Sequence, residues 1–218
     1  ANDNEIKRLT HFTTNKLLNK IINKLLTKKK THISEQDFNL SLLSNNSMLY
    51  LEGYWQNQKD YPINDKLRDN NFIFKNKLNN ARLKISNKII LSNSCSIHIR
   101  RGDYVENSLY AQYDELYYIN SIKLINNSYP DVIFYIFSDD IKWVKDNFFI
   151  NSKLAQNIHY IDNDDSNPSD DMRLMSLCKH NIIANSSFSW WGAWLNKNKN
   201  KIVISPKNWY SDSTLNSK

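Results

Sequence analysis

The chain has 218 residues, of which 40% are hydrophobic and 12% aromatic, enough to bury a core and too many for a disordered chain. The formal net charge of +7 favours an anionic partner (nucleic acid, acidic lipid or a phosphate-bearing substrate) without choosing among these classes. No apolar run reaches membrane-spanning length and nothing resembles a signal peptide, so we expect a cytoplasmic protein.

An apolar stripe at helical spacing runs from Leu17 to Leu26 in the first part of the chain. Lysines lie off this stripe, which predicts a surface helix with a solvated basic face. The alternative is a peripheral contact of this helix with an anionic membrane. Residues 65–90 are expected to form a helix followed by a polar stretch, and we place a domain boundary between residues 90 and 91.

From residue 91 onward, short apolar runs alternate with segments of helical periodicity. Strands are predicted over residues 94–100, 131–137, 157–161, 181–184 and 201–205, and helices over residues 113–127, 141–149, 170–179 and 188–196. Repeated strand–helix units predict a parallel sheet flanked by helices, that is, a Rossmann-like α/β domain over residues 91–218. The chain has three glycines. Either phosphate is bound without a glycine-rich loop, or the glycine-rich part is absent.

A first polar loop, His98-Ile-Arg-Arg-Gly-Asp-Tyr104, follows the strand that opens this region. His98 and Arg100 share one face of the strand, at the carboxyl end where ligands of such sheets bind. Arg100 can bind a phosphate through two parallel N–H groups, and Arg101 adds a second positive charge. Asp103 can orient an arginine or act as a base. A structural Arg–Asp ion pair at a turn is an equally weighted alternative.

A second polar loop, Ser138-Asp139-Asp140, follows the aromatic, buried strand. Its side chains can cap the next helix, with Ser138 or Asp139 as the capping residue. The functional alternative is recognition of guanine, which presents two neighbouring N–H donors that one carboxylate can accept and that adenine lacks. We predict that Asp140 binds the guanine and that Asp139 caps the helix.

A third polar loop precedes a helix predicted to begin near Phe188. Hydroxyls and free backbone N–H groups at a helix start can bind an anion without glycine, although plain helix capping is the alternative. The candidate donor-binding residues of this loop are Asn185, Ser186, Ser187, Phe188 and Ser189. Together the three loops supply cations, carboxylates and a helix start, a combination that suits a nucleoside diphosphate.

The same segments resemble the motifs of a known family. His98–Tyr104 is similar to the first motif of the α-1,2-fucosyltransferases of glycosyltransferase family 11, Phe134–Ile141 resembles the second, and Leu174–Trp194 resembles the third. An upstream segment, Leu51–Gln56, also looks like part of this family. A related arginine pair occurs in α-1,6- and protein O-fucosyltransferases, so those linkages are alternatives.

The resemblance implies a GT-B architecture and inverting transfer of fucose from GDP-fucose to a galactose-containing glycan acceptor in α-1,2 linkage. The resemblance implies that the product is part of a surface glycan such as O-antigen. It also implies that the enzyme needs no cofactor and no metal. The resemblance also implies that Arg100 contacts the β-phosphate, that His98 and Asp140 lie near the nucleoside, and that the segment from Ser186 to Ser189 lies near the phosphates. Asp103 is the candidate general base.

The Asp162-Asn-Asp164 segment matches a metal-binding Asp-x-Asp motif in its letters. It lies in a polar stretch that ends at Asn167-Pro168, which predicts a surface turn. Arginines and a helix start can supply fixed positive potential where negative charge grows on a leaving diphosphate. We therefore expect activity that does not depend on a divalent metal.

One departure from the family concerns the first domain. Family members open with a strand and a glycine-rich segment resembling Gly-Gly-Leu-Gly-Asn-Gln, which this sequence lacks. We therefore expect a fragment in which residues 1–90 form an incomplete, acceptor-side domain, and which binds GDP without transferring fucose. The rival interpretation of such a chain is a non-catalytic GDP-binding module. A nucleic-acid partner is disfavoured, because the lysine-rich helix lacks interleaved aromatic residues and no nucleic-acid motif occurs.

Overall fold

The computed structural model describes residues 3–11, 18–19, 21–22, 29–39, 41–46, 48–53, 65–111, 113–149, 157–162 and 167–217. The chain divides into two compact units, Ala1–Asn70 and Asn71–Lys218. Most of the predicted basic helix lies outside the described residues, as do Tyr54 to Gln56 and Asp164. Within the described ranges, no helix combines the length and the apolar character that crossing a membrane requires.

The first unit is made of short elements. Those described are α1 (Asp3–Leu9), β1 (His32–Ser34), η1 (Glu35–Asp37), α3 (Ser41–Asn45), β2 (Tyr50–Glu52) and the start of α4 (Asp65–Asn71). Strands β1 and β2 pair in parallel. The pairing is supported by side chains, because His32 Nε2 of β1 lies 3.0 Å from Glu52 Oε2 of β2. The Thr31 hydroxyl, just before β1, donates to the Leu9 carbonyl at the end of α1.

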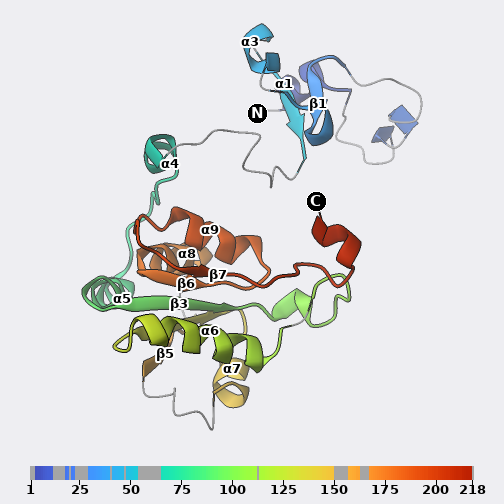
Figure 1. Ribbon diagram of the computed structural model, residues 1–218. Helices are drawn as coiled ribbons and strands as arrows, with labels where there is room; N and C mark the ends of the chain where they lie inside the picture. Colours follow the sequence, from blue (N-terminus) through green and yellow to red (C-terminus); the bar gives the residue numbers. More distant parts are fainter. Residues whose placement is uncertain are drawn as a thin grey trace. The chain divides into compact units, whose positions relative to one another are not determined.

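The second unit is built on a parallel sheet, whose strands in the described residues follow the order β5-β4-β3-β6-β7 (Figure 1). The strands are β3 (Ser94–Ile99), β4 (Ile133–Ser138), β5 (Ile158–Tyr160), β6 (His180–Ile182) and β7 (Val203–Ile204). They alternate with α6 (Glu115–Ser128), α7 (Ile141–Asn147), α8 (Pro168–Leu177) and α9 (Ser187–Leu195). The predicted parallel sheet with flanking helices is confirmed, and each strand and helix predicted after residue 91 overlaps an observed element.

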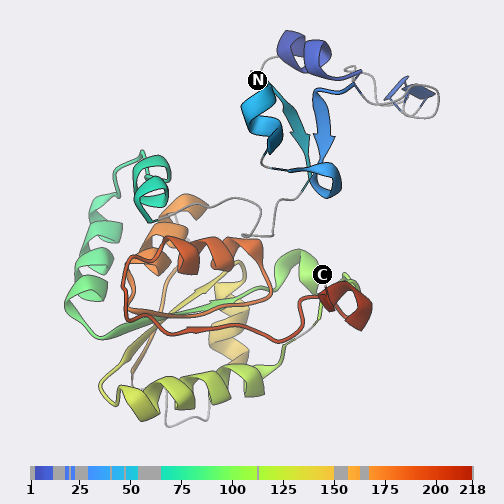
Figure 2. The ribbon, with the colours of Figure 1, turned by 45° about the horizontal axis from the view of Figure 1, so that its top comes forward.

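Different helices cover the two faces of this sheet (Figure 2). Ile97 and Ile99 of the central strand β3 belong to the core that also contains residues of α6 and α7. His98 lies between them in sequence and faces the other side, where its ring centroid is 5.4 Å from that of Phe188 on α9. The alternation predicted for this strand is therefore confirmed.

Helix α5 (Asn80–Leu91) corrects the prediction for residues 65–90, which placed a helix first and a polar stretch after it. Helix α4 ends at Asn71, and a second helix begins after Asn79, whose side chain accepts a hydrogen bond from Arg82 N. The buried residues of α5 are Arg82, Ser86 and Ile89, so polar side chains occupy most of its inner stripe and the sequence shows little apolar periodicity. Helix α5 contacts α8, and the division between the units accordingly precedes it.

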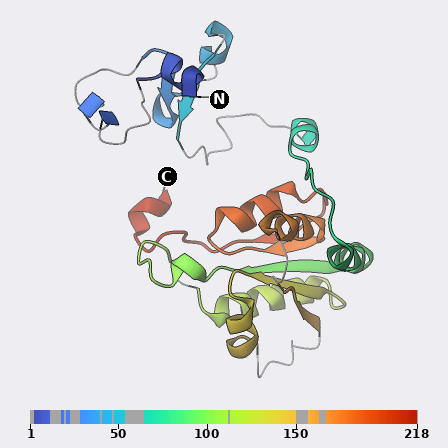
Figure 3. The same ribbon diagram turned by 180° about the vertical axis from the view of Figure 1, so that it is seen from behind.

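The end of the chain lies beside the segment that follows β3 (Figure 3). Ala111 N donates to the Trp209 carbonyl, Ser211 N donates to the Leu109 carbonyl, and Tyr110 pairs with Tyr210. The short helix η5 (Ser213–Ser217) follows. The loop after β3 is thus held by backbone hydrogen bonds to a segment far away in sequence.

Candidate functional site

The three predicted polar loops meet at one edge of the sheet. They follow β3, β4 and β6, which are adjacent and parallel. The chain leaves β3 toward β4 on one side and later returns to β6 on the other. Such a reversal leaves a crevice beyond the carboxyl ends of the strands, where ligands of open parallel sheets bind.

A cavity of about 610 Å³ lies at this edge, and we call it the donor cavity. The predicted site residues that line it are His98, Arg100, Asp103, Ser138, Asp139, Ser186, Ser187 and Phe188. Four other predicted residues do not line it: Arg101, Asp140, Asn185 and Ser189. The structure therefore places eight of the predicted residues in the lining of the donor cavity and four outside it.

Two carboxylates from different loops hold Arg100 at the wall. Its Nη2 lies 2.6 Å from Asp103 Oδ1, and its Nη1 lies 3.1 Å from Asp139 Oδ2. Asp139 Oδ1 also accepts a hydrogen bond of 2.9 Å from Arg101 N, which ties the β3 loop to the β4 loop. The predicted Arg–Asp ion pair is therefore present. It leaves a second N–H on each Nη for a ligand and fixes the guanidinium before the ligand arrives.

The absence of a side chain at Gly102 makes room for this arrangement. A Cβ atom at this position would lie 2.4 Å from Asp139 Oδ2, closer than such contacts occur in proteins. Gly102 also begins the short helix η3 (Gly102–Tyr104) that carries Asp103. One of the three glycines of the chain thus allows Asp139 to approach the two arginines.

The prediction that Asp139 caps the following helix was wrong. Asp140 is the capping residue of α7, because its Oδ1 accepts a hydrogen bond from Trp143 N at 3.2 Å. Its Oδ2 lies 3.5 Å from Arg101 Nε. Asp139 reaches across to the β3 loop instead, which leaves the helix start to the next residue. Asp140 is therefore engaged outside the donor cavity.

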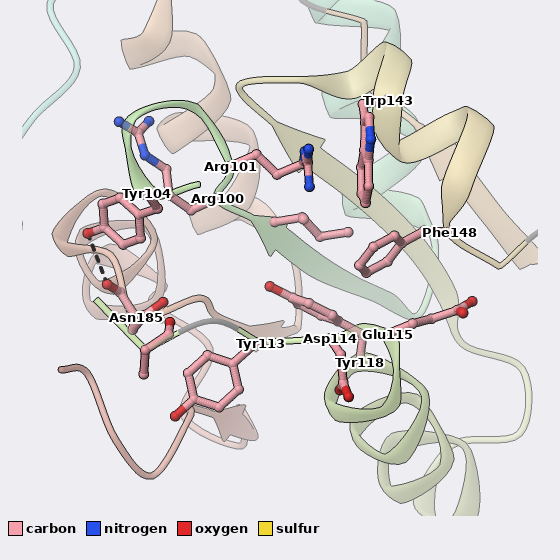
Figure 4. Close-up of a pocket in the computed structure, with 12 residues that line it drawn as sticks. Arg100, Arg101, Tyr104, Tyr113, Asp114, Glu115, Tyr118, Trp143, Phe148 and Asn185 are labelled. Atoms are coloured by element: carbon pink, nitrogen blue, oxygen red, sulfur yellow. Dashed lines mark hydrogen bonds between the residues drawn. The ribbon is translucent and has the colours of Figure 1, made fainter. Parts of the chain in front are cut away.

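Arg101 also lies away from the donor cavity. Its guanidinium carbon is 3.2 Å from the centroid of the Trp143 ring. Together with Asn185 it lines a smaller cavity, which is bounded by residues of α6 and α7 (Figure 4). Its side chain therefore supports the β4 loop through Asp140 and Trp143.

His98 contributes an uncharged ring to the donor cavity. It is 3% exposed, and burial, followed by the charge of Arg100, lowers its pKa to about 3. The imidazole is therefore neutral at physiological pH. Its Nδ1 is buried and has no hydrogen-bond partner in the described part of the chain. A ligand hydroxyl or N–H could complete this nitrogen's hydrogen bonding.

The third loop presents the start of α9 to the same cavity. Ser186 occupies the N-cap position and its side chain makes no capping bond, so among the described residues the first N–H groups of α9 are not capped by their own N-cap side chain. Ser189 instead donates to the carbonyls of Ala184 and Ser186, and the Asn185 amide donates to Ala111 and Trp209. Ser189 and Asn185 thus brace the loop, while the helix start remains suited to an anion.

Asp171 on α8 lines the donor cavity and was not predicted from the sequence as a site residue. Its side chain is 11% exposed, and its Oδ1 lies 2.8 Å from Nη1 of Arg82 on α5. Burial raises its pKa to about 6, and the charge of Arg82 limits the rise. Because α5 was not expected as a helix, its arginine could not be matched to this carboxylate in advance.

Aromatic side chains complete the wall near Arg100. Tyr104 and Tyr110 stack with ring centroids 3.9 Å apart, and both line the donor cavity. The Tyr104 hydroxyl donates to the Asn185 carbonyl at 3.1 Å. Tyr104 and Tyr110 gave no periodic signal in the sequence, so their contribution to the site is seen only in the structure.

The Asp162 side chain is more than half exposed and pairs with Lys145, as a surface turn would allow. Its carbonyl accepts a hydrogen bond from Arg82 Nη2 at 2.8 Å. Asp164, the other acid of the Asp-x-Asp motif, lies outside the described residues. Metal independence stays a prediction.

The site thus joins an oriented arginine, an uncapped helix start and buried polar groups at a sheet reversal, which suits a nucleoside diphosphate. Residues 3–218 match the family model described as Glycosyl transferase family 11. The chain belongs to glycosyltransferase family 11. The resemblance inferred from the three motifs is confirmed.

Relatives of this family 11 chain carry several names. An alpha-1,2-colitosyltransferase of Escherichia coli is 37% identical over 169 residues, which cover 76% of this chain and 57% of that protein. The O-antigen biosynthesis glycosyltransferase WbnK of Escherichia coli is 42% identical over 136 residues, or 59% of this chain and 44% of that protein. A galactoside 2-alpha-L-fucosyltransferase of Caenorhabditis elegans is 26% identical over 123 residues, 49% of this chain and 30% of that protein. The chain spans about half the length of the two bacterial relatives.

Proposed function

We propose that the family 11 enzyme to which this chain belongs transfers a fucose-type sugar from a GDP-sugar to a galactoside, with inversion and in α-1,2 linkage, for an O-antigen-like surface glycan. A two-domain GT-B enzyme is the architecture we propose for it. The observation that carries the proposal is Arg100, held between Asp103 and Asp139 on the wall of the donor cavity. The uncapped start of α9 supplies further donors on the same wall.

These groups match the charge that develops during transfer. As the sugar departs, negative charge grows on the β-phosphate of GDP. The remaining N–H groups of Arg100 and the first N–H groups of α9 can stabilise it without reorganising. The cavity also contains Asp103, Asp139 and Asp171, but each is paired with an arginine. Because the arginines offset these carboxylates, the phosphate can bind to the N–H donors of Arg100 and of the start of α9. Asp103, 64% exposed beside Arg100, is the proposed acceptor of the proton from the attacking hydroxyl.

The sugar that is transferred is open to a direct test. Colitose is fucose without its 3-hydroxyl, and the relatives are named for both sugars. GDP-fucose and GDP-colitose should each be supplied with lactose, and the linkage of any product determined by NMR. A site that hydrogen-bonds the 3-hydroxyl would reject colitose by about 10⁴-fold. GDP binding without transfer from either donor, by this chain and by an upstream-extended chain alike, would favour the non-catalytic alternative.

We assign guanine recognition to Asp171 in place of Asp140. Asp171 lines the donor cavity, whereas Asp140 caps α7 and contacts Arg101. Both oxygens of Asp139 are engaged by the two arginines, so it is less suited to the base. A carboxylate at Asp171 can accept the two adjacent N–H donors of guanine while Arg82 holds it in place.

Asp171→Asn is expected to weaken GDP binding far more than binding of UDP or ADP, because the amide presents a donor to guanine's donors. In the unmodified protein, GDP affinity should be full well above the Asp171 pKa of about 6 and decline as the pH falls through it, since the protonated carboxyl accepts poorly. The pKa of His98, about 3, lies below this range. Calorimetry between about pH 8 and about pH 5 measures the effect of the substitution on each nucleotide and the pH dependence of GDP affinity. Equal losses for all three nucleotides would refute the assignment, and Asp140→Asn is the matched control.

Transfer is expected to survive excess EDTA, because Arg100 and the start of α9 can neutralise the diphosphate without a divalent ion. The measurement is the rate of product formation with and without the chelator. Activity that is lost in EDTA and restored by manganese or magnesium would contradict this expectation and would direct attention to Asp162 and Asp164.

A further inference from the structure

A second cavity, of about 220 Å³, lies next to the β3 loop, and its lining residues are drawn in Figure 4. Its volume is several times what one water molecule requires. Trp143 and Phe148 supply aromatic surface to it. Tyr118 of α6 also lines it. Arg100 and Tyr104 line both cavities, so a molecule in the second cavity would lie beside the donor. The nucleotide roles proposed above do not use this space.

The hydroxyl of Tyr118 is a polar group that the fold leaves available here. Tyr118 is 2% exposed, and its ring packs edge-on against Tyr117 and Phe148 at 4.8 and 5.7 Å. Figure 4 shows its hydroxyl pointing toward the middle of the cavity. In the part of the chain that the structure describes, this hydroxyl makes no hydrogen bond. Its oxygen does not belong to the fully buried unpartnered atoms, so it is accessible from the cavity, where a polar ligand could form a hydrogen bond with it.

The charges on the wall of this cavity balance one another. Arg101 lies near Asp140 and stacks on Trp143. Asp114 accepts hydrogen bonds from the first turn of α6, and Glu115 accepts one from Phe149 N at 2.6 Å. Two arginines and two carboxylates line the space, so neither a phosphate nor a cation meets an excess of opposite charge. An uncharged ligand with several hydroxyls suits this wall better.

We infer that this second cavity binds one neutral pyranose ring of the acceptor glycan, with Tyr118 and Arg101 contacting its hydroxyls. An apolar face of such a ring would pack on Phe148, beside the Arg101 guanidinium that stacks on Trp143. The inference rests on the proposed transfer function and specifies where part of the acceptor is recognised. It places that recognition in the second unit, on the same loop that holds the donor.

Two variants test the cavity with little effect on the fold. Tyr118→Phe removes the hydroxyl and keeps the ring packing. Ala111→Leu adds volume at the cavity wall and keeps the backbone bonds of Ala111 to Asn185 and Trp209. Tyr135→Phe is the matched control, since it deletes another buried tyrosine hydroxyl, one that contacts Ser92 and lines neither cavity. Each protein should be titrated by NMR with the methyl glycosides of galactose, glucose and their N-acetylated amines, with inorganic phosphate, and with GDP.

The expected result is binding of at least one glycoside, weakened about threefold to tenfold by Tyr118→Phe and abolished by Ala111→Leu. GDP affinity should be unchanged in both variants and in Tyr135→Phe. In transfer assays, the KM for the acceptor should rise while the KM for the GDP-sugar stays the same. Wild-type glycoside affinity in Ala111→Leu, phosphate binding alone, or no glycoside binding at all would overturn the inference. Glycoside binding without transfer from any GDP-sugar would refute the proposed function and leave the sugar site standing.

Discussion

Replacing Arg100 with lysine is expected to weaken GDP binding by about tenfold or more. Lysine keeps the charge, but its three N–H donors share one nitrogen, so it cannot bind a phosphate through two parallel N–H groups or span Asp103 and Asp139 from two nitrogens as the planar guanidinium does. A hydrogen bond to a charged group contributes about 1.5–3 kcal/mol, and about 1.4 kcal/mol corresponds to a tenfold change in affinity. Titration calorimetry with GDP measures the effect.

The control for this variant is Arg173→Lys. Arg173 donates to the Asn76 carbonyl at 3.0 Å and lines neither cavity, so the same substitution there tests the chemistry of the change away from the site. Undiminished GDP affinity in Arg100→Lys would show that its side chain does not bind the diphosphate. Equal losses of GDP affinity in both variants would show that the loss comes from a general disturbance of the fold and not from a lost contact with the diphosphate.

Gly102→Ala is expected to reduce GDP affinity by about tenfold and the transfer rate by about a hundredfold. The new Cβ atom would lie 2.4 Å from Asp139 Oδ2, so the carboxylate must move and release both Arg100 and the Arg101 N–H. The φ angle of Gly102 is not positive, so the backbone itself accommodates alanine. Only the end of a flexible side chain must shift, and the fold should therefore be retained while the site is disturbed.

A double-mutant cycle distinguishes this mechanism from general disruption of the loop. In an Asp139→Ala background, the carboxylate that meets the new methyl group is gone, so Gly102→Ala should have little further effect on GDP affinity. Calorimetry on the two single variants and the double variant gives the coupling, and circular dichroism checks the fold. Additive losses would mean that Gly102 acts independently of Asp139.

The sequence predicted the second unit well because its strands and helices have strong local signals. The apolar runs of β3 and β4 and the amphipathic pattern of α6 are visible without tertiary information. Helix α5 was missed because its buried stripe contains Arg82 and Ser86, which become inner residues only through partners elsewhere in the chain. A local pattern cannot show that an arginine is buried against a distant carboxylate.

The candidate site was predicted at the level of loops and less well at the level of single side chains. The parallel topology was enough to bring the loops after β3, β4 and β6 together. Which of two adjacent acids caps α7 depends on the reach of Asp139 over Gly102, which no spacing rule contains. Arg100 lines both cavities and Arg101 lines only the second, a difference that the sequence did not predict because both residues follow the end of β3.

The uncapped start of α9 has a consequence for how this site tolerates sequence change. Its donors are backbone N–H groups, and every residue except proline carries one. An alanine scan through Ser186, Ser187 and Ser189 would therefore leave these donors in place and would understate what the loop contributes. A substitution of Arg100, in contrast, removes its donors, because they all belong to one side chain. The backbone donors of α9 are thus robust to mutational drift, while the donors of Arg100 depend on a single codon.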